Sequence, residues 1–265
     1  MIIAQISDLH IAPPGEKTCA VAPMAENLAR VIAHIRAAPH RPDLVIVTGD
    51  ITHDATPAEA RHARSLLEEL PAPWRIVPGN HDRRALLRDH FGPETCPATA
   101  EGFIQHVTDL GPLCLIGLDS LDEGKPGGRL CRSRLDWLAG ALSDAGGRRV
   151  LLYLHHPPLP LGVPETDEDG FAGADALGRL VSQHGGVERI LCGHVHLATH
   201  AGWRGSIVST APSIGMELTL DLTAEPPPSR FRLSAPGYML HHLHPSGGLV
   251  SHVVSLPEDE RTHGF

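Results

Sequence analysis

Five short apolar runs, each followed by polar residues that can bind metal ions, constrain this chain more than any other feature. Each run has the length of a β-strand and is rich in Ile, Val and Leu, as in strands covered on both faces. The runs cover 2–6, 43–47, 74–77, 149–154 and 188–191. The residues after them are Asp8 and His10; Gly49 and Asp50; Gly79, Asn80, His81 and Asp82; His155 and His156; and Gly193, His194 and His196.

Helical patterns separate these runs along the first two thirds of the chain. Pro57 follows Thr56, a good N-cap, and starts one of them. The predicted helices cover 25–37, 57–70, 83–88, 133–142 and 174–184, and a further strand covers 113–118. Alternating strands and helices predict a layered α/β domain.

After Gly202 the sequence no longer alternates between strand and helix patterns. Further strands are predicted at 206–209, 239–244 and 249–254. The stretch 211–238 contains Glu225 followed by three prolines, so an irregular cap or a contact between subunits is expected there. Three histidines, at 241, 242 and 244, are interpreted as the surface of an edge strand rather than as a further metal site.

The polar residues after the five runs are expected to meet at one edge of the fold. Ligands of α/β sheets lie beyond the carboxyl ends of the strands. Each motif alone is weak, because Gly-Asp is usually a turn and Asp-x-His is often surface, but five in order are a strong signal. Mixed carboxylate, amide and imidazole ligands favour Mn, Fe, Co or Zn over Ca, and the absence of thiolates disfavours a structural zinc site.

Charge and composition exclude several other classes of protein. The 265 residues carry 22 Lys and Arg against 31 Asp and Glu, a net charge of −9, so a basic surface for a nucleic-acid polymer is not expected. No apolar run approaches the length of a membrane span, and the N-terminus does not resemble a signal peptide. Five cysteines without CxxC spacing are typical of a reduced, cytoplasmic chain.

Together these motifs resemble the calcineurin-like metallophosphoesterases. The resemblance covers about residues 1–210, and it is closer to the bacterial class III cyclic-nucleotide phosphodiesterases and glycerophosphodiesterases. The segments similar to that branch are Ile6-Ser7-Asp8, Gly15-Glu16-Lys17, the run His155-His156-Pro157-Pro158 with the four residues after it, and Cys192-Gly193-His194. The family implies a four-layer fold, a β-sandwich flanked by helices. The expected organisation of the chain is a catalytic domain over 1–210, an irregular cap or dimer-contact segment over 211–238, and strands over 239–265 that return to the core.

The same resemblance implies a centre of two divalent metal ions. The first would be bound by Asp8, His10 and His196, the second by Asn80, His155 and His194, and Asp50 would bridge them. His155 rather than His156 is chosen, because the family ligand is followed by one residue and then proline. His81 is expected to contact the phosphate or protonate the leaving group, with Asp82 orienting it, and His53 and Asn80 are expected to contact the substrate. Cys19 and Arg83 are possible neighbours of this site.

The expected activity is hydrolysis of small phosphodiesters, such as 3′,5′-cyclic nucleotides or glycerophosphodiesters. Two metal ions about 3.5–4 Å apart bind phosphoryl oxygens and activate a bridging hydroxide for in-line attack. The alternatives are a phosphomonoesterase or a nuclease of the same superfamily, and an interaction scaffold without metals. A homodimer or a higher homo-oligomer is expected from the resemblance.

Overall fold

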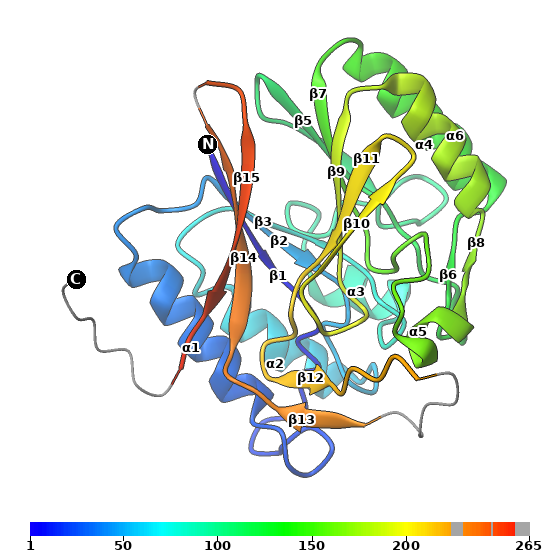
Figure 1. The fold of residues 1–265 in the computed structure, drawn as a ribbon. Helices are drawn as coiled ribbons and strands as arrows, with labels where there is room; N and C mark the ends of the chain where they lie inside the picture. The colour runs from blue at the N-terminus through cyan, green and yellow to red at the C-terminus, as the bar shows by residue number, and fades with distance from the viewer. Residues whose placement is uncertain (224–229, 245, 258–265) are drawn as a thin grey trace.

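Two β-sheets packed face to face form the centre of the molecule. The computed structural model describes residues 1–223, 230–244 and 246–257. Helices cover the outer face of each sheet, which gives four layers (Figure 1). This is the helix-flanked sandwich expected from the resemblance. Among the described residues, no helix has the length and apolarity that crossing a membrane requires.

The element bounds follow from the backbone hydrogen bonds. The strands are β1 (Ile2–Ile6), β2 (Leu44–Thr48), β3 (Trp74–Val77), β4 (His106–Asp109), β5 (Leu113–Gly117), β6 (Gly128–Arg129), β7 (Arg149–Tyr153), β8 (Phe171–Ala172), β9 (Val187–Cys192), β10 (Thr199–Trp203), β11 (Ser206–Thr210), β12 (Met216–Leu218), β13 (Phe231–Leu233), β14 (Gly237–Leu243) and β15 (Leu249–Ser255). The helices are α1 (Met24–Ala37), α2 (Pro57–Leu67), α3 (Arg84–His90), α4 (Arg132–Ala145), α5 (Pro164–Asp169) and α6 (Ala174–His184).

Each sheet contains a block of parallel strands, with antiparallel strands on one side of it in the five-stranded sheet and on both sides in the six-stranded sheet. The five-stranded sheet has the order β15-β14-β1-β2-β3, with β1, β2 and β3 parallel. The six-stranded sheet has the order β10-β11-β9-β7-β5-β4, with β11, β9, β7 and β5 parallel. The parallel strands of each sheet therefore share one carboxyl edge.

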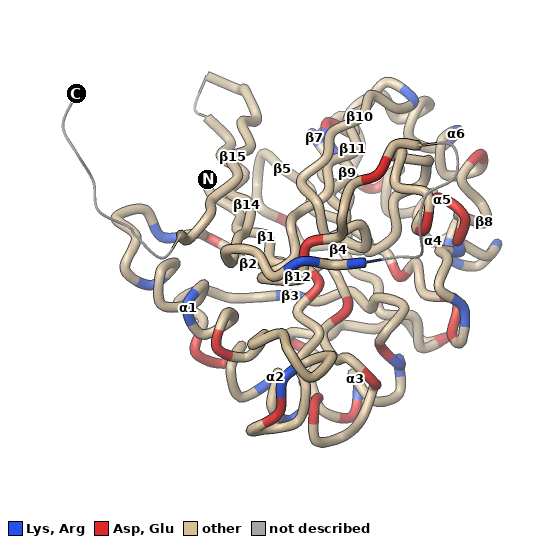
Figure 2. The backbone as a smooth tube through the Cα atoms, turned by 60° about the horizontal axis from the view of Figure 1, so that its bottom comes forward, with Lys and Arg blue, Asp and Glu red and all other residues tan. Residues whose placement is uncertain are grey.

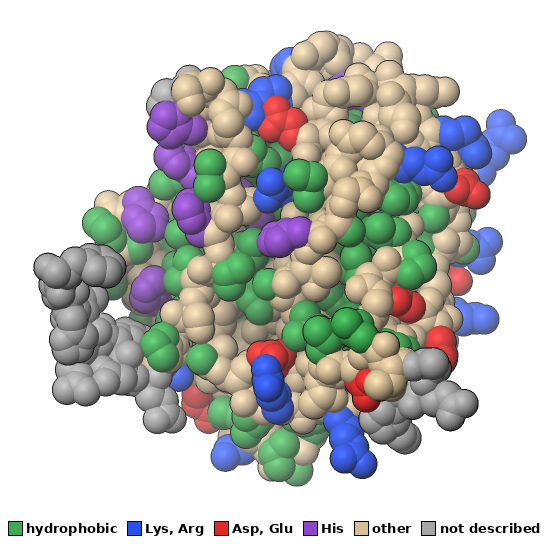
Figure 3. All heavy atoms as spheres, in the orientation of Figure 1, with side chains coloured by type: hydrophobic (Ala, Val, Ile, Leu, Met, Phe, Trp, Pro, Cys, Tyr) green, Lys and Arg blue, Asp and Glu red, His purple; other side chains and the backbone are tan. Residues whose placement is uncertain are grey.

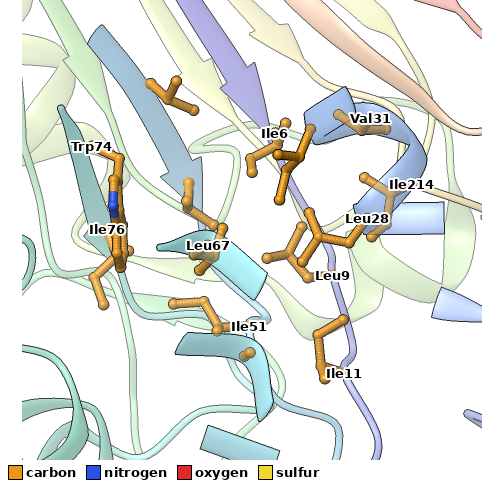
Figure 4. Packing of buried hydrophobic residues seen from close by; sticks show 14 of the residues in the cluster. Ile6, Leu9, Ile11, Leu28, Val31, Ile51, Leu67, Trp74, Ile76 and Ile214 are labelled. Carbon is orange, nitrogen blue, oxygen red and sulfur yellow. The ribbon is translucent and has the colours of Figure 1, made fainter. Parts of the chain in front are cut away.

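Alternate side chains of each strand face the helices and the other sheet. On β2, Leu44 and Ile46 pack between the sheets, whereas Val45 and Val47 pack against the helices. Figure 4 shows the helix side of the five-stranded sheet, where Leu28 and Val31 of α1 and Leu67 of α2 pack near its strands. Burial on both faces is the physical reason why these strands show little polar alternation.

Helix α2 begins as its sequence predicts. Thr56 and Glu59 form a capping box, and Pro57 occupies the first turn. The helix ends at Leu67 rather than at residue 70, because residues 68–70 continue only in tight turns.

The interpretation of residues 241, 242 and 244 as an edge-strand surface is wrong for His241. β14 lies between β15 and β1, so it is an interior strand, and His241 is 1% exposed. Its Nε2 bonds Gln5 Oε1 at 2.9 Å and its Nδ1 bonds Ser251 Oγ at 2.7 Å. Histidines do gather on the visible surface over β14 and β15 (Figure 3).

The stretch expected to be irregular holds two short strands. β12 and β13 pair antiparallel, with Met216 opposite Leu233. The three prolines at 226–228 and the C-terminal residues 258–265 lie outside the described residues.

Candidate metal centre

The carboxyl ends of β1, β2, β3, β7 and β9 converge on one site. The segments that leave these strands are joined by backbone hydrogen bonds. Asp8 N donates to Gly49 O at 3.2 Å, His10 N donates to Asp50 O at 2.8 Å, and Gly193 N donates to His155 O at 2.9 Å. The two sheets thus deliver their polar exits to a common place, as the topology of parallel strands requires.

Glycine is needed where these exits approach one another. Gly49 has φ +90°, and a Cβ there would lie 2.5 Å from His155 Nδ1 and 2.8 Å from Gly79 N. A Cβ on Gly193 would lie 2.8 Å from both Asp8 Oδ2 and Thr48 O. A side chain at either position would separate the segments that form the site.

Five residues of the site also hold left-handed backbone conformations. Of the nine non-glycine residues with positive φ in the described chain, five are Asp8, His10, Asp50, His194 and His196, at 53°, 43°, 49°, 72° and 56°. Such conformations cost about 1–3 kcal/mol each and are concentrated at functional sites. The sharp turns point these side chains back over the sheet edge.

One set of side chains, the Asp8 group, consists of Asp8, His10, Asp50 and His196. Their donor atoms lie within 4.8 Å of one another, and all four residues are buried. His10 Nε2 lies 3.1 Å from His196 Nε2 and 3.5 Å from Asp50 Oδ2. His196 Nε2 lies 3.5 Å from Asp8 Oδ1, while its Nδ1 donates to Met216 O at 2.7 Å.

A second set, the Asn80 group, consists of Asn80, His155 and His194. Asn80 Oδ1 lies 3.0 Å from His155 Nε2 and 3.1 Å from His194 Nδ1. His155 Nδ1 donates to Thr48 O at 2.7 Å, which leaves Nε2 to face the site. His155 Nε2 also lies 3.4 Å from Asp50 Oδ2, so Asp50 faces both groups.

The donor set fits divalent cations. Two buried carboxylates, an amide oxygen and several imidazole nitrogens face a common centre, with no lysine or arginine among them. Within the described residues, Asp8 Oδ2 and His10 Nδ1 are buried without a hydrogen-bond partner. A buried carboxylate oxygen without a donor is costly, and a cation beside Asp8 Oδ2 would remove that cost.

The pKa values of Asp8, Asp50 and His155 show that positive charge is stabilised in this site. Burial raises the pKa of Asp8. Burial alone would raise the pKa of Asp50 too, but His155 and His10 lower it well below its ordinary value. Burial opposes protonation of His155, yet Asp50 and Asp8 raise the pKa of His155 to about 9. A proton on His155 thus supplies charge that a bound cation would displace.

The side chain of His156 forms hydrogen bonds with the loop beside the site rather than with the donor groups. Its Nδ1 pairs with Ser120 Oγ at 2.9 Å, and its Nε2 pairs with Pro126 O at 3.1 Å. Both ring nitrogens are therefore engaged, whereas His155 directs Nε2 at Asp50 and Asn80.

His81 and His53 lie at the open side of the site. His81 N donates to Asp50 Oδ1 at 2.9 Å, and its ring lies 4.6 Å from the His10 ring. His81 Nδ1 donates to His53 O at 2.7 Å, and the two rings stack 5.5 Å apart. The carbonyl of His53 fixes the tautomer of His81 and leaves Nε2 available.

The expectation that Asp82 orients His81 is wrong. The Asp82 carboxylate is 3% exposed and accepts hydrogen bonds from the backbone of Gly79, Ile51 and Thr52. Burial and the nearby Asp50 raise the pKa of Asp82 to about 6. Asp82 therefore ties the exits of β2 and β3 together.

The two neighbours proposed on sequence lie close to His53. Cys19 Sγ is 3.6 Å from His53 Nε2. Arg83 lines a cavity of about 210 Å³ together with His53, Asn80 and His81.

A residue that sequence reasoning missed is Asp169, whose Oδ2 lies 3.7 Å from His194 Nε2. Asp169 belongs to an acidic stretch that matches no recognisable sequence motif, so no local signal indicated it.

The sequence profile of the calcineurin-like phosphoesterases matches residues 1–198. The chain belongs to this family. The match spans every member of the Asp8 group and the Asn80 group.

Two bacterial relatives of known name cover most of the chain. The chain is 32% identical to a probable glycerophosphodiester phosphodiesterase, GpdQ, of Arcobacter nitrofigilis, over 100% of this chain and 97% of that protein. It is 30% identical to the 3′,5′-cyclic adenosine monophosphate phosphodiesterase CpdA of Escherichia coli, over 97% of this chain and 90% of that protein.

A solved structure shares the fold. A dimetal phosphatase of Danio rerio superposes with a TM-score of 0.69 at 16% identity, over 96% of this chain and 98% of that chain. This similarity bears on the arrangement of the sheets and helices alone.

Proposed function

We propose that this family member hydrolyses small phosphodiesters, such as 3′,5′-cyclic nucleotides or glycerophosphodiesters, with two divalent metal ions. The observation that carries the proposal is the position of Asp50. Its Oδ2 lies 3.5 Å from His10 Nε2 and 3.4 Å from His155 Nε2, between the two donor groups. The names of the relatives, a glycerophosphodiesterase and a cyclic-nucleotide phosphodiesterase, support the substrate class.

In this proposal the two groups are two metal sites that share one carboxylate. Asp8, His10 and His196 would hold the first ion, Asn80, His155 and His194 would hold the second, and Asp50 would be shared between them. The ions are Mn, Fe, Zn or Co, since oxygen and imidazole ligands suit these metals. When bound, they supply Lewis-acid stabilisation of phosphoryl oxygens and a low pKa for coordinated water.

The protein side chains position the substrate and move a proton. His81 Nδ1 is held by His53 O, so its Nε2 is the atom that can donate to a phosphoryl oxygen or to the leaving alkoxide. Asn80 and His53 line the same cavity and are proposed to contact the diester. The neutral amide of Asn80 adds no negative charge where an anionic substrate binds.

A turnover panel with added Mn²⁺ tests the function. We expect bis(p-nitrophenyl) phosphate, cyclic AMP or glycerophosphocholine to be hydrolysed faster than p-nitrophenyl phosphate, and EDTA to abolish turnover. Including 2′,3′-cyclic AMP separates the two cyclic isomers. Monoester turnover well above diester turnover would contradict the proposal in favour of a phosphomonoesterase, and absence of bound metal would favour a scaffold.

A nuclease is disfavoured by the charge of the chain. The net charge is −9, and basic and acidic residues are interspersed without a continuous basic stripe in the view of Figure 2. Polymer binding relies on Lys and Arg that neutralise several phosphates. The substrate in this proposal is therefore small.

A cytoplasmic location is also proposed, because all five cysteines are free thiols in the structure.

We extend the proposal to a homodimer or a higher homo-oligomer. Leu220, Leu222 and Leu233, around β12 and β13, are 58%, 71% and 54% exposed. Exposed apolar side chains that gather on one segment are typical of a contact surface. Light scattering in solution should give at least twice the chain mass of 28.4 kDa. A monomer mass at micromolar concentration would remove this part of the proposal.

A further inference from the structure

Three of the inward-facing imidazoles, those of His155, His196 and His194, have a polar partner facing the outer ring nitrogen, whereas His10 Nδ1 has none among the described residues. His155 Nδ1 donates to Thr48 O, and His196 Nδ1 donates to Met216 O, each at 2.7 Å. Both partners are backbone carbonyls of elements adjoining the site. An imidazole that binds a metal through one nitrogen carries its proton on the other, so the outer partner fixes the ring and its basicity.

His194 is oriented in the opposite sense. Its Nδ1 faces Asn80 Oδ1 at 3.1 Å, and its Nε2 points outward. The group facing that Nε2 is a carboxylate, Asp169 Oδ2 at 3.7 Å. Among the described residues this is the one close contact of the Asp169 carboxylate with a basic side chain, and the His194 imidazole there is neutral, because burial lowers the pKa of His194 to about 3. His194 is therefore the imidazole of the Asn80 group whose outer partner carries a negative charge.

The position of Asp169 is fixed by the loops around it. Asp169 is the last residue of α5, and Gly170 after it has φ +70°. Gly170 O accepts from Gly128 N at 3.0 Å, and β8 pairs with β6 just beyond. A Cβ on Gly127 would overlap the carbonyl of Asp169, so the two loops pack closely.

The same loop forms a wall beside the metal centre. His194 and residues between Pro157 and Phe171 line a cavity of about 150 Å³. Helix α5 carries Glu165, Asp167, Glu168 and Asp169, visible as acidic segments in Figure 2. Of these carboxylates, that of Asp167 accepts hydrogen bonds from the backbone N–H groups of Leu161 and Gly162. The carboxylate of Asp169 lies next to the His194 ring.

We propose that Asp169 is a positioning residue for the second metal group: its carboxylate holds His194 with Nε2–H outward and Nδ1 toward Asn80. This inference rests on the proposed two-metal function. The carboxylate makes the inner nitrogen a better donor and keeps the ring from rotating away. Because Asp169 belongs to a separate loop, docking of that loop on residues 127–128 is coupled to retention of metal by His194.

Mn²⁺ titration of the full-length protein tests the inference. Asp169→Asn keeps the shape of the side chain and removes its charge, so we expect the dissociation constant of the weaker Mn²⁺ site to rise about 10–100-fold. The tighter site should change little. Calorimetry and the electron paramagnetic resonance signal of bound Mn²⁺ measure both sites without relying on turnover. Asp169→Glu keeps the charge and should retain more affinity than Asp169→Asn.

Glu168→Gln is the matched control. It removes the same charge from the adjacent position of α5, on an exposed side chain. Wild-type affinity in Glu168→Gln together with weakened affinity in Asp169→Asn would support a direct contact. Equal weakening in both variants, or wild-type affinity in Asp169→Asn, would overturn the inference. Circular dichroism and thermal unfolding establish that both variants are folded.

The outcomes for Asp169 and for the proposed function are separable. If wild-type protein binds Mn²⁺ and hydrolyses diesters while Asp169→Asn binds normally, the positioning role fails and the function stands. If Asp169→Asn weakens binding but wild-type protein hydrolyses no diester, the function fails and the positioning role stands. A wild-type protein that binds no Mn²⁺ would overturn both.

Discussion

Replacing Asp50 with Asn should remove the one carboxylate that faces both the Asp8 group and the Asn80 group, and diester hydrolysis should be lost with it. The carboxylate is 2% exposed and is the group that faces both His10 and His155. An amide of the same shape presents one oxygen without charge, so it cannot hold two cations together. Lewis-acid stabilisation by a metal is worth several kcal/mol, and 1.36 kcal/mol is tenfold in rate, so diester turnover should fall about 10³-fold or more.

Metal binding gives an independent measurement of the same change. Saturating Mn²⁺ at 100 times its dissociation constant stabilises a protein by about 2.7 kcal/mol, which at this size raises the Tm by roughly 5–10 °C. We expect that rise in wild-type protein and at most part of it in Asp50→Asn. Asp144→Asn, an exposed carboxylate on α4, is the matched control and should behave as wild type. Full Mn²⁺ stoichiometry and activity in Asp50→Asn would refute the bridging role.

The convergence of the strand ends could be predicted because its determinants are local. The apolar runs before Asp8, Asp50, Asn80, His155 and His194 mark strands without knowledge of the rest of the chain. The rule that parallel strands share a carboxyl edge then brings their exits together. The structure places these side chains at one site, with the short distances described above.

Interactions between distant segments could not be predicted in this way. β14 pairs with β1 in the register Ile2 opposite His242, and nothing near either segment encodes that partner. His241 consequently lies between the sheets rather than at an edge. Asp82 follows His81 in sequence, but its carboxylate turns to the backbone of residues 51 and 52. Adjacency in sequence was the wrong guide to its partner.

Weak local signals hid several elements. β10 has exposed and half-buried residues, and β12 and β13 have three residues each. Helix α5 has six residues and no fully buried side chain, so no apolar period marks it. Asp169 was missed for this reason, although it faces His194. Short elements held by neighbouring loops carry little information in their own sequence.

Removing the imidazole of His81 should affect substrates according to their leaving group. His81 Nδ1 is committed to His53 O, so Nε2 is the atom free to protonate a departing oxygen. A p-nitrophenolate leaves without a proton, whereas an alkoxide needs one. General acid catalysis contributes about 10²–10⁴-fold, so His81→Ala should lose that factor on glycerophosphocholine or cyclic AMP. With bis(p-nitrophenyl) phosphate the loss should stay below about tenfold.

A second substitution separates proton donation from phosphate binding. His81→Gln retains a neutral hydrogen-bond donor, so it should recover binding of a phosphoryl oxygen, seen in KM, without recovering kcat on alkyl diesters. His40→Ala, at an exposed histidine remote from the strand exits, is the control for imidazole removal. Equal losses in kcat for aryl and alkyl diesters would show that His81 only binds the phosphate. The ratio of the two losses therefore decides what Nε2 does, because both substrates would react at the same site and differ in the proton that the leaving group requires.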